Sequence, residues 1–122
     1  MSEAVSDAES AASDSVVREL TAFQQNILVV LAEEPRYGLA IKRTLEEYYG
    51  TEVNHGRLYP NLDNLVEMEL VEKSELDKRT NQYELTEAGR EALLGRLDWV
   101  LGKYVTDEDH VADIQELVEK YA

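Results

Sequence analysis

Three polar side chains, Arg57, Asn61 and Asn64, recur every three or four residues in the stretch VNHGRLYPNLDNLVEMEL, residues 53–70. At about 100° per residue in a helix, this spacing places them close together on one face. An arginine can donate two hydrogen bonds to a guanine edge, and an asparagine can pair in the same way with an adenine edge. The three side chains therefore have the chemistry of base recognition. The alternative is that they only solvate an exposed helix face.

Gly56 and Pro60 are poor helix formers, yet both lie in this helical pattern. Pro60 cannot donate to the carbonyl four residues back, and that carbonyl belongs to Gly56, which has no Cβ to resist adjustment. Asn54 is a suitable N-cap, and the free N–H groups after it could approach a phosphate closely. An irregular first turn without a function is the alternative.

The polar turn DKRTN, residues 77–81, holds a second group of candidate contacts. Lys78 and Arg79 are adjacent cations at the tip of an expected hairpin, where they could contact phosphates or the minor groove. A solvated turn is the alternative. The complete set of expected DNA contacts comprises Tyr37, Lys42, Arg43, Asn54, His55, Gly56, Arg57, Tyr59, Pro60, Asn61, Asn64, Lys73, Lys78, Arg79 and Asn81.

Other chemistry finds little support in the sequence. There is no cysteine, which removes disulfides, thiolate catalysis and Cys-ligated metals. No pattern places a nucleophile beside a base, and the glycines form no phosphate loop, so we expect no enzyme and no cofactor. His110 lies among Asp107, Asp109 and Asp113, which could collect a divalent ion, although these acids more simply stabilise a helix start.

The spacing of apolar residues predicts the elements that position these side chains. A first helix starts near Leu20, with Thr21 as its cap, and ends before Pro35; a second carries Tyr37, Ile41, Leu45 and Tyr48 on one face and stops at Gly50. The third buries Leu58, Leu62, Leu65 and Val66. The segments LVEKSEL and QYEL then form a two-stranded hairpin.

Two further helices follow the hairpin. Thr86 caps a long helix that runs to about Val105, and its apolar residues cover more than one stripe, which requires a second covering surface. The last helix opens with TDED, a capping-box-like start with an acid at the third helical position. We expect a homodimer whose contacts are Leu20, Phe23, Leu97, Leu101, Tyr104, Val111, Ile114, Leu117, Val118 and Tyr121.

The charge is unevenly distributed. The chain of 122 residues holds 26 acidic and 12 basic residues, a net charge of −14, but residues 36–82 hold 9 acidic and 7 basic residues, a net charge of −2. An acidic surface suits a cytoplasm at molar salt, where a Debye length of about 3 Å stops distant acids from repelling a bound polyanion. An ordinary acidic protein is the alternative. The start MSEAVSDAESAASDS reads as a disordered acidic tail, neither a signal peptide nor a membrane anchor.

Three helices and a hairpin are the order of a mainly α, winged helix-turn-helix domain. We expect a disordered tail at 1–17, the DNA-binding domain at 18–92 and C-terminal dimerisation helices at 93–122. The sequence resembles the PadR family of winged-helix transcription regulators over roughly residues 23–94. The matching segments are ILVVLAEEPRYGLAIKRTLEE, GRLYPNLDNL and YELTEAGREAL.

The resemblance implies a homodimeric regulator that binds double-stranded DNA at a roughly palindromic operator. The acidic, cysteine-free chain is most similar to haloarchaeal members that regulate oxidative-stress genes. Leu39, His55, Arg57 and Glu69 depart from the usual family residues, so base preferences do not transfer. The short C-terminal helix replaces a larger ligand-binding bundle, so no small-molecule effector is expected. A winged helix that binds protein instead of DNA is the rival interpretation.

Overall fold

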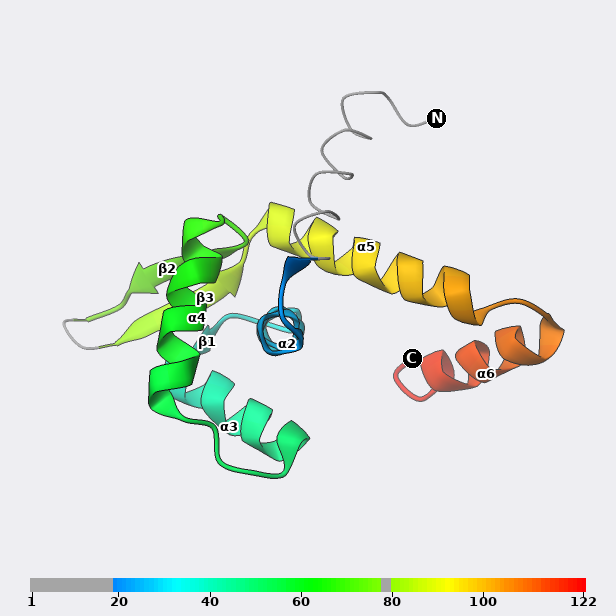
Figure 1. The fold of residues 1–122 in the computed structure, drawn as a ribbon, viewed down its shortest axis with the longest axis horizontal. Coiled ribbons are helices and arrows are strands. Elements are labelled where there is room, and N and C mark those ends of the chain that lie inside the picture. The colour runs from blue at the N-terminus through cyan, green and yellow to red at the C-terminus, as the bar shows by residue number, and fades with distance from the viewer. Residues whose placement is uncertain (1–18, 78–79) are drawn as a thin grey trace, which may run out of the picture.

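The computed structural model describes residues 19–77 and 80–122. Its elements follow the expected order with one added strand (Figure 1). They are α2 (Ala22–Leu31), β1 (Arg36–Tyr37), α3 (Gly38–Tyr49), α4 (His55–Glu67), β2 (Val71–Glu75), β3 (Asn81–Leu85), α5 (Glu87–Tyr104) and α6 (Glu108–Glu119). The expected tail at 1–17, Lys78 and Arg79 lie outside the described residues.

The helix caps explain why the helices begin and end where they do. Thr21 and Gln24 form a reciprocal capping box at α2, and Thr86 accepts a hydrogen bond from the Gly89 N–H at α5. Gly50 ends α3 with a left-handed φ of 71°. These caps are the ones that the sequence predicts.

The start of α6 differs from the prediction. Asp107, not Thr106, is the N-cap, and its carboxylate accepts from the His110 N–H at 2.9 Å. His110 therefore takes the third helical position, where an acid was expected. Asp107 is favoured over Thr106 as the N-cap because its carboxylate also interacts favourably with the positive end of the helix dipole.

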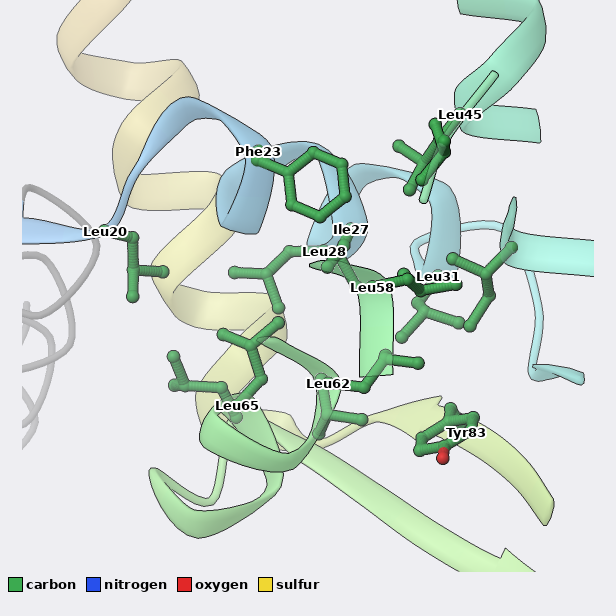
Figure 2. Close-up of a cluster of buried hydrophobic side chains, with 14 of the residues drawn as sticks. Leu20, Phe23, Ile27, Leu28, Leu31, Leu45, Leu58, Leu62, Leu65 and Tyr83 are labelled. Atoms are coloured by element: carbon green, nitrogen blue, oxygen red, sulfur yellow. The ribbon is translucent and has the colours of Figure 1, made fainter. Parts of the chain in front are cut away.

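The hydrophobic core lies where α2, α3 and α4 meet the sheet (Figure 2). Leu58, Leu62 and Leu65 of α4 are fully buried, as predicted, and Val66 packs against them. On α3 the predicted stripe is half correct, because Ile41 and Leu45 are buried whereas Tyr37 and Tyr48 are exposed. The remaining buried apolar residues are Leu20, Phe23, Ile27, Leu28, Leu31, Val53, Leu70, Val71, Tyr83 and Ala92.

The sheet has three strands in the order β1-β3-β2, all antiparallel. β2 and β3 form the predicted hairpin, with Lys73 opposite Tyr83. β1 was not predicted. It pairs Arg36 with Tyr83 and Tyr37 with Gln82, and α3 begins at the next residue.

The turn from α4 into the hairpin is tightly packed against the start of α5. Thr86 donates from its backbone to the Leu70 carbonyl and from its hydroxyl to the Glu69 carbonyl. A Cβ on Gly89 would overlap the Leu70 carbonyl oxygen, so this close approach requires glycine. The Leu-Thr-x-x-Gly run therefore fixes α5 to the hairpin.

Helix α5 extends away from the body of the molecule and α6 turns back beside it (Figure 1). The expected domain boundary at residue 92 falls inside the continuous α5. At the elbow, the Tyr104 hydroxyl donates to Asp113 at 2.5 Å, and the rings of Tyr104 and His110 stack with centroids 4.3 Å apart. In the described part of the chain, no helix has the length and apolar character needed to cross a membrane.

Candidate nucleic-acid interface

The first turn of α4 has the geometry that the sequence predicts. The Asn54 side chain accepts from the Gly56 N–H at 2.6 Å, and a Cβ on Gly56 would lie 3.1 Å from the same oxygen. Pro60 lies inside the helix. The tight cap therefore tolerates glycine best, and Asn54, Gly56 and Pro60 all remain exposed.

Two of the three predicted base-reading residues contact α2. The guanidinium of Arg57 lies over the Phe23 ring, 3.9 Å from its centroid. The Asn61 side chain donates to the Arg57 carbonyl at 2.8 Å and accepts from the buried Gln24 at 3.0 Å. Asn61 thus holds α4 against α2, and both its amide oxygen and its amide nitrogen are engaged within the protomer. Arg57 remains exposed.

The outermost face of α4 is more acidic than expected. It lies opposite the buried leucines and exposes Pro60, Asp63, Asn64 and Glu67. Asp63 and Glu67 did not feature among the expected site residues. Projecting the whole helix and taking the direction opposite the leucines would have identified them.

Tyr59 connects α4 to the start of α3. Its ring lies 4.3 Å from that of His55, and a Cβ on Gly38 would overlap its hydroxyl. Gly38 is buried because Tyr59 covers it. Gly38, of the Tyr37-Gly38 pair, therefore provides the surface on which Tyr59, of the Gly-x-Leu-Tyr-Pro run, packs.

A cleft of about 450 Å³ lies between the start of α3, α4 and β3. Its lining includes the expected contacts Tyr37, Arg43, Tyr59 and Asn81. Tyr83, which was not an expected contact, also lines it. Burial, with a smaller contribution from the charge of Asp63, raises the pKa of Tyr83, so its hydroxyl stays protonated.

The remaining expected cations differ in their surroundings. Lys42 donates to Glu46 at 2.8 Å, and this hydrogen bond is the main cause that lowers the pKa of Glu46. Lys42 is therefore engaged within α3 and is poorly placed for a phosphate. Arg43 and Lys73 are exposed. Lys78 and Arg79 lie outside the described residues.

The expected dimer contacts differ in their exposure. Leu20 and Phe23 are 6% and 4% exposed in the core of the protomer, so their side chains have little surface left for a second chain. Ile114 is half-buried. The others are exposed on α5 and α6: Leu97, Leu101, Tyr104, Val111, Leu117, Val118 and Tyr121. Leu94 and Val100 are exposed on the same side of α5, whereas Trp99 is exposed on the opposite side, with Arg96 and Lys103 over its ring.

The acidic residues around His110 are engaged in the elbow. Asp107 caps α6, Asp113 accepts from Tyr104, and the His110 ring contacts the Tyr104 carbonyl. The hydrogen bond to Asp113 raises the pKa of Tyr104. Among the described residues, no group of three or more histidine and carboxylate side chains has a metal-binding arrangement.

The family model described as the transcriptional regulator PadR-like family matches residues 27–94. Among solved structures, the complex hsRosR-S4, of RosR from Halobacterium salinarum, is 62% identical, with 88% of this chain and 94% of that chain covered and a TM-score of 0.87. The structure of Halobacterium salinarum RosR from crystals grown in NaBr is 63% identical, with 85% of this chain and 94% of that chain covered and a TM-score of 0.84. A PadR-like transcription factor from Bacteroides fragilis is 25% identical, with 82% of this chain and 89% of that chain covered and a TM-score of 0.56. No curated protein matches the chain.

Proposed function

The chain belongs to the transcriptional regulator PadR-like family, and from that premise we propose that it is a homodimeric regulator that binds specific DNA sequences. The observation that carries the proposal is the arrangement of α4. Its leucines are fully buried, and its capped start and outer face are exposed beside a cleft that β3 also lines. Such an arrangement is typical of a recognition helix beside a wing, and it supports the proposal.

In the proposed complex, α4 enters the major groove. Asn64, His55 and Arg57 contact base edges, because they are exposed and carry suitable donors or acceptors. Asn54, Gly56 and Pro60 bring the start of α4 close to the sugar-phosphate backbone of the DNA. Asn61 positions α4 instead of reading bases, and Lys42 pairs within α3 instead of contacting the DNA backbone.

The wing completes the proposed contacts. Lys73, Lys78, Arg79 and Asn81 contact the flanking backbone or minor groove, and Arg43, Tyr37 and Tyr59 contact phosphate from the other side of the cleft. These assignments are supported by the cationic or hydrogen-bonding chemistry of the side chains. In addition, Arg43, Tyr37, Tyr59 and Asn81 line the same cleft.

The second protomer covers the apolar surface of α5 and α6. An exposed apolar surface of this extent is typical of an interface. In a two-fold dimer, the two α4 helices would enter successive major grooves about 34 Å apart, which requires a roughly palindromic operator.

We further propose that the regulator acts in a cytoplasm at high salt and in the response to oxidative stress. The net charge of −14 and the similarity to RosR from Halobacterium salinarum support the high-salt environment. The oxidative-stress role rests on the sequence resemblance alone. Mapping occupied genomic sites with and without peroxide tests it, and occupancy that peroxide leaves unchanged would contradict it.

The central experiment selects a duplex from a random pool and measures its affinity by fluorescence anisotropy in molar KCl. Asn64→Ala and Arg57→Gln should each weaken the selected duplex about tenfold and relax the base preference, because one good base contact contributes about 1–3 kcal/mol. Arg90→Gln is the matched control for charge, because Arg90 is exposed at the start of α5 and pairs with Glu87. Unchanged affinity in both test variants would reject α4 as the reader.

The two carboxylates on the outer face of α4 favour one other function, a winged helix that docks on a basic protein surface. Asp63 and Glu67 would then form ion pairs with the partner. If the wild-type protein selects no duplex from dilute to molar salt, this alternative replaces DNA binding.

A further inference from the structure

We propose that the cleft at the start of α3 is a binding site for one phosphate group, which in the DNA complex is a backbone phosphate. The inference deepens the proposed function and rests on it for the identity of the occupant. The site is formed by the first turn of α3 together with Tyr59, Tyr83 and Arg43.

The first observation is the uncapped start of α3. Tyr37 occupies the N-cap position, and its side chain makes no capping hydrogen bond. The N–H groups of the first helical turn have no carbonyl partner within the helix, and they carry the positive end of its dipole. The Gly38 N–H is used by the pairing of β1 with β3, whereas Leu39 and Ala40, which contribute the next two groups, both line the cleft. A twelve-residue helix thus presents free donors to it.

The second observation is independent of the helix. Tyr83 is 2% exposed, its ring packs in the core cluster, and it lines the cleft. Its hydroxyl makes no side-chain hydrogen bond with any residue that the structure describes. Figure 2 shows this oxygen turned away from the labelled leucines. The ring is buried whereas the hydroxyl opens onto the cleft, so it is free to donate to an acceptor bound there.

A second phenol is held at the same place. Tyr59 packs on Gly38, where a Cβ would overlap the Tyr59 hydroxyl. The hydroxyl therefore lies at the first turn of α3, and the absence of a side chain on Gly38 is what allows it to do so. Two phenol groups and backbone N–H groups provide several donors around one space.

The charges around the cleft favour an anion on balance. Arg43 is exposed, lines the cleft and forms no ion pair within the described residues. Asp63 opposes an anion, because its charge acts on Tyr83. The same charge, added to burial, keeps the Tyr83 hydroxyl protonated and therefore able to donate. The guanidinium and the helix end offset the single carboxylate.

The size of the cleft favours a phosphate that belongs to a chain. Its volume of about 450 Å³ exceeds that of an isolated phosphate and leaves space for the adjoining sugars. Asn81 of β3 lines the far side, so one phosphate would touch both the first turn of α3 and the wing. Free inorganic phosphate has the same chemistry, and the experiment below separates the two sources.

The first arm uses the full-length protein and the selected duplex. Tyr83→Phe removes one hydroxyl and retains the ring, and the affinity should fall about tenfold, the scale of one hydrogen bond to a charged group. A scan of duplexes with single methylphosphonates should find one position that weakens the wild type and has no further effect on Tyr83→Phe. Tyr48→Phe is the matched control, because this tyrosine is 73% exposed and outside the cleft.

Folding of each variant is checked by thermal melting, and Arg43→Gln provides an exposed second variant if Tyr83→Phe is destabilised. Duplex affinity that neither Tyr83→Phe nor Arg43→Gln changes would overturn the site while leaving DNA binding through α4 intact. A methylphosphonate effect that is the same in wild type and variant would also overturn it.

The second arm needs no DNA, so it decides the inference even if no duplex is selected. Inorganic phosphate is titrated at constant potassium concentration while the amide signals of Leu39 and Ala40 are followed by NMR. Saturable shifts that Tyr83→Phe and Gly38→Ala both abolish would show that the site also takes the free anion. Without saturable shifts, the site depends on the duplex result alone, and the absence of both effects overturns it.

Discussion

Glu69 illustrates how one residue can carry strain. Among the described residues it is the non-glycine residue with positive φ, at 64°, directly after the C-cap of α4. The turn needs this conformation so that Leu70 can enter the core and Thr86 can reach the Glu69 carbonyl. The conformation is unfavourable for a residue with a Cβ.

Glu69→Gly should therefore stabilise the protein by about 1 kcal/mol, because glycine adopts the left-handed conformation without steric cost. The measurement is the midpoint of urea unfolding at constant salt. Glu67→Gly is the matched control: it removes the same side chain at the last residue of α4, where the backbone is helical, and should not stabilise the protein. Equal effects at both positions would contradict the explanation.

At the residue scale, the sequence predicts local interactions well and distant ones poorly. Asn54 and Thr86 are caps that depend on their own neighbours, and both predictions are confirmed. The contacts of Arg57 and Asn61 depend on Phe23 and Gln24, more than thirty residues away. A projection of α4 alone cannot show that α2 occupies that side of the helix.

At the element scale, Glu46 joins the end of α3 to the start of α4. Its carboxylate accepts from Lys42 at 2.8 Å and from the Val53 backbone at 2.9 Å. These two hydrogen bonds lower the pKa of Glu46, with the Lys42 bond as the larger cause. A lowered pKa means that the ionised Glu46 stabilises the folded state. This stabilisation is present at a pH above the pKa that Glu46 has in the unfolded chain, and it is lost as the pH falls through its pKa in the folded protein.

Glu46→Gln should accordingly lower the melting temperature near neutral pH and have a smaller effect in acid, below the ordinary range of a glutamate pKa. Glutamine keeps an oxygen for Val53, so the difference isolates the charge. Glu47→Gln, on the exposed neighbouring residue, serves as the control and should change the melting curve little at either pH. A Glu46→Gln effect independent of pH would contradict the assignment.

The periodic elements are the ones that the sequence predicts. α2, α3, α4, α5, α6 and the hairpin each span enough residues to show a repeat of apolar positions, and all are confirmed. β1 has two residues and shows no period, so it could not be predicted. Its pairing with β3 depends on the tertiary fold.

At the scale of the whole molecule, the apolar surface of α5 and α6 carries the prediction about assembly. Leu101→Glu combined with Leu117→Glu should give a monomer, because two carboxylates would be buried without partners in the dimer. Sedimentation equilibrium measures the mass, and the affinity for a palindromic duplex should fall with it. For the mass measurement, Leu76→Glu is the control for adding charge to an exposed leucine outside α5 and α6. A dimer that survives the double substitution would exclude this interface.

The distribution of charge predicts an unusual response to salt. Counterion release normally weakens protein–DNA complexes as salt rises. Asp63 and Glu67 on the outer face of α4 would face the DNA and require cations, which offsets part of that release. The affinity for the selected duplex should therefore depend only weakly on KCl. Asp63→Asn with Glu67→Gln should steepen the dependence, and an equally steep loss in wild type and variant would contradict the prediction.

The strand β1 also sets a limit on protein engineering with this scaffold. Tyr37 is both the last residue of β1 and the N-cap of α3, so the wing and the start of α3 share one stretch of backbone. A chimera that received residues 71–85 from a relative would keep a docking strand evolved for a different hairpin. Swapping residues 36–37 together with the hairpin should give better-folded hybrids than transplanting the hairpin by itself.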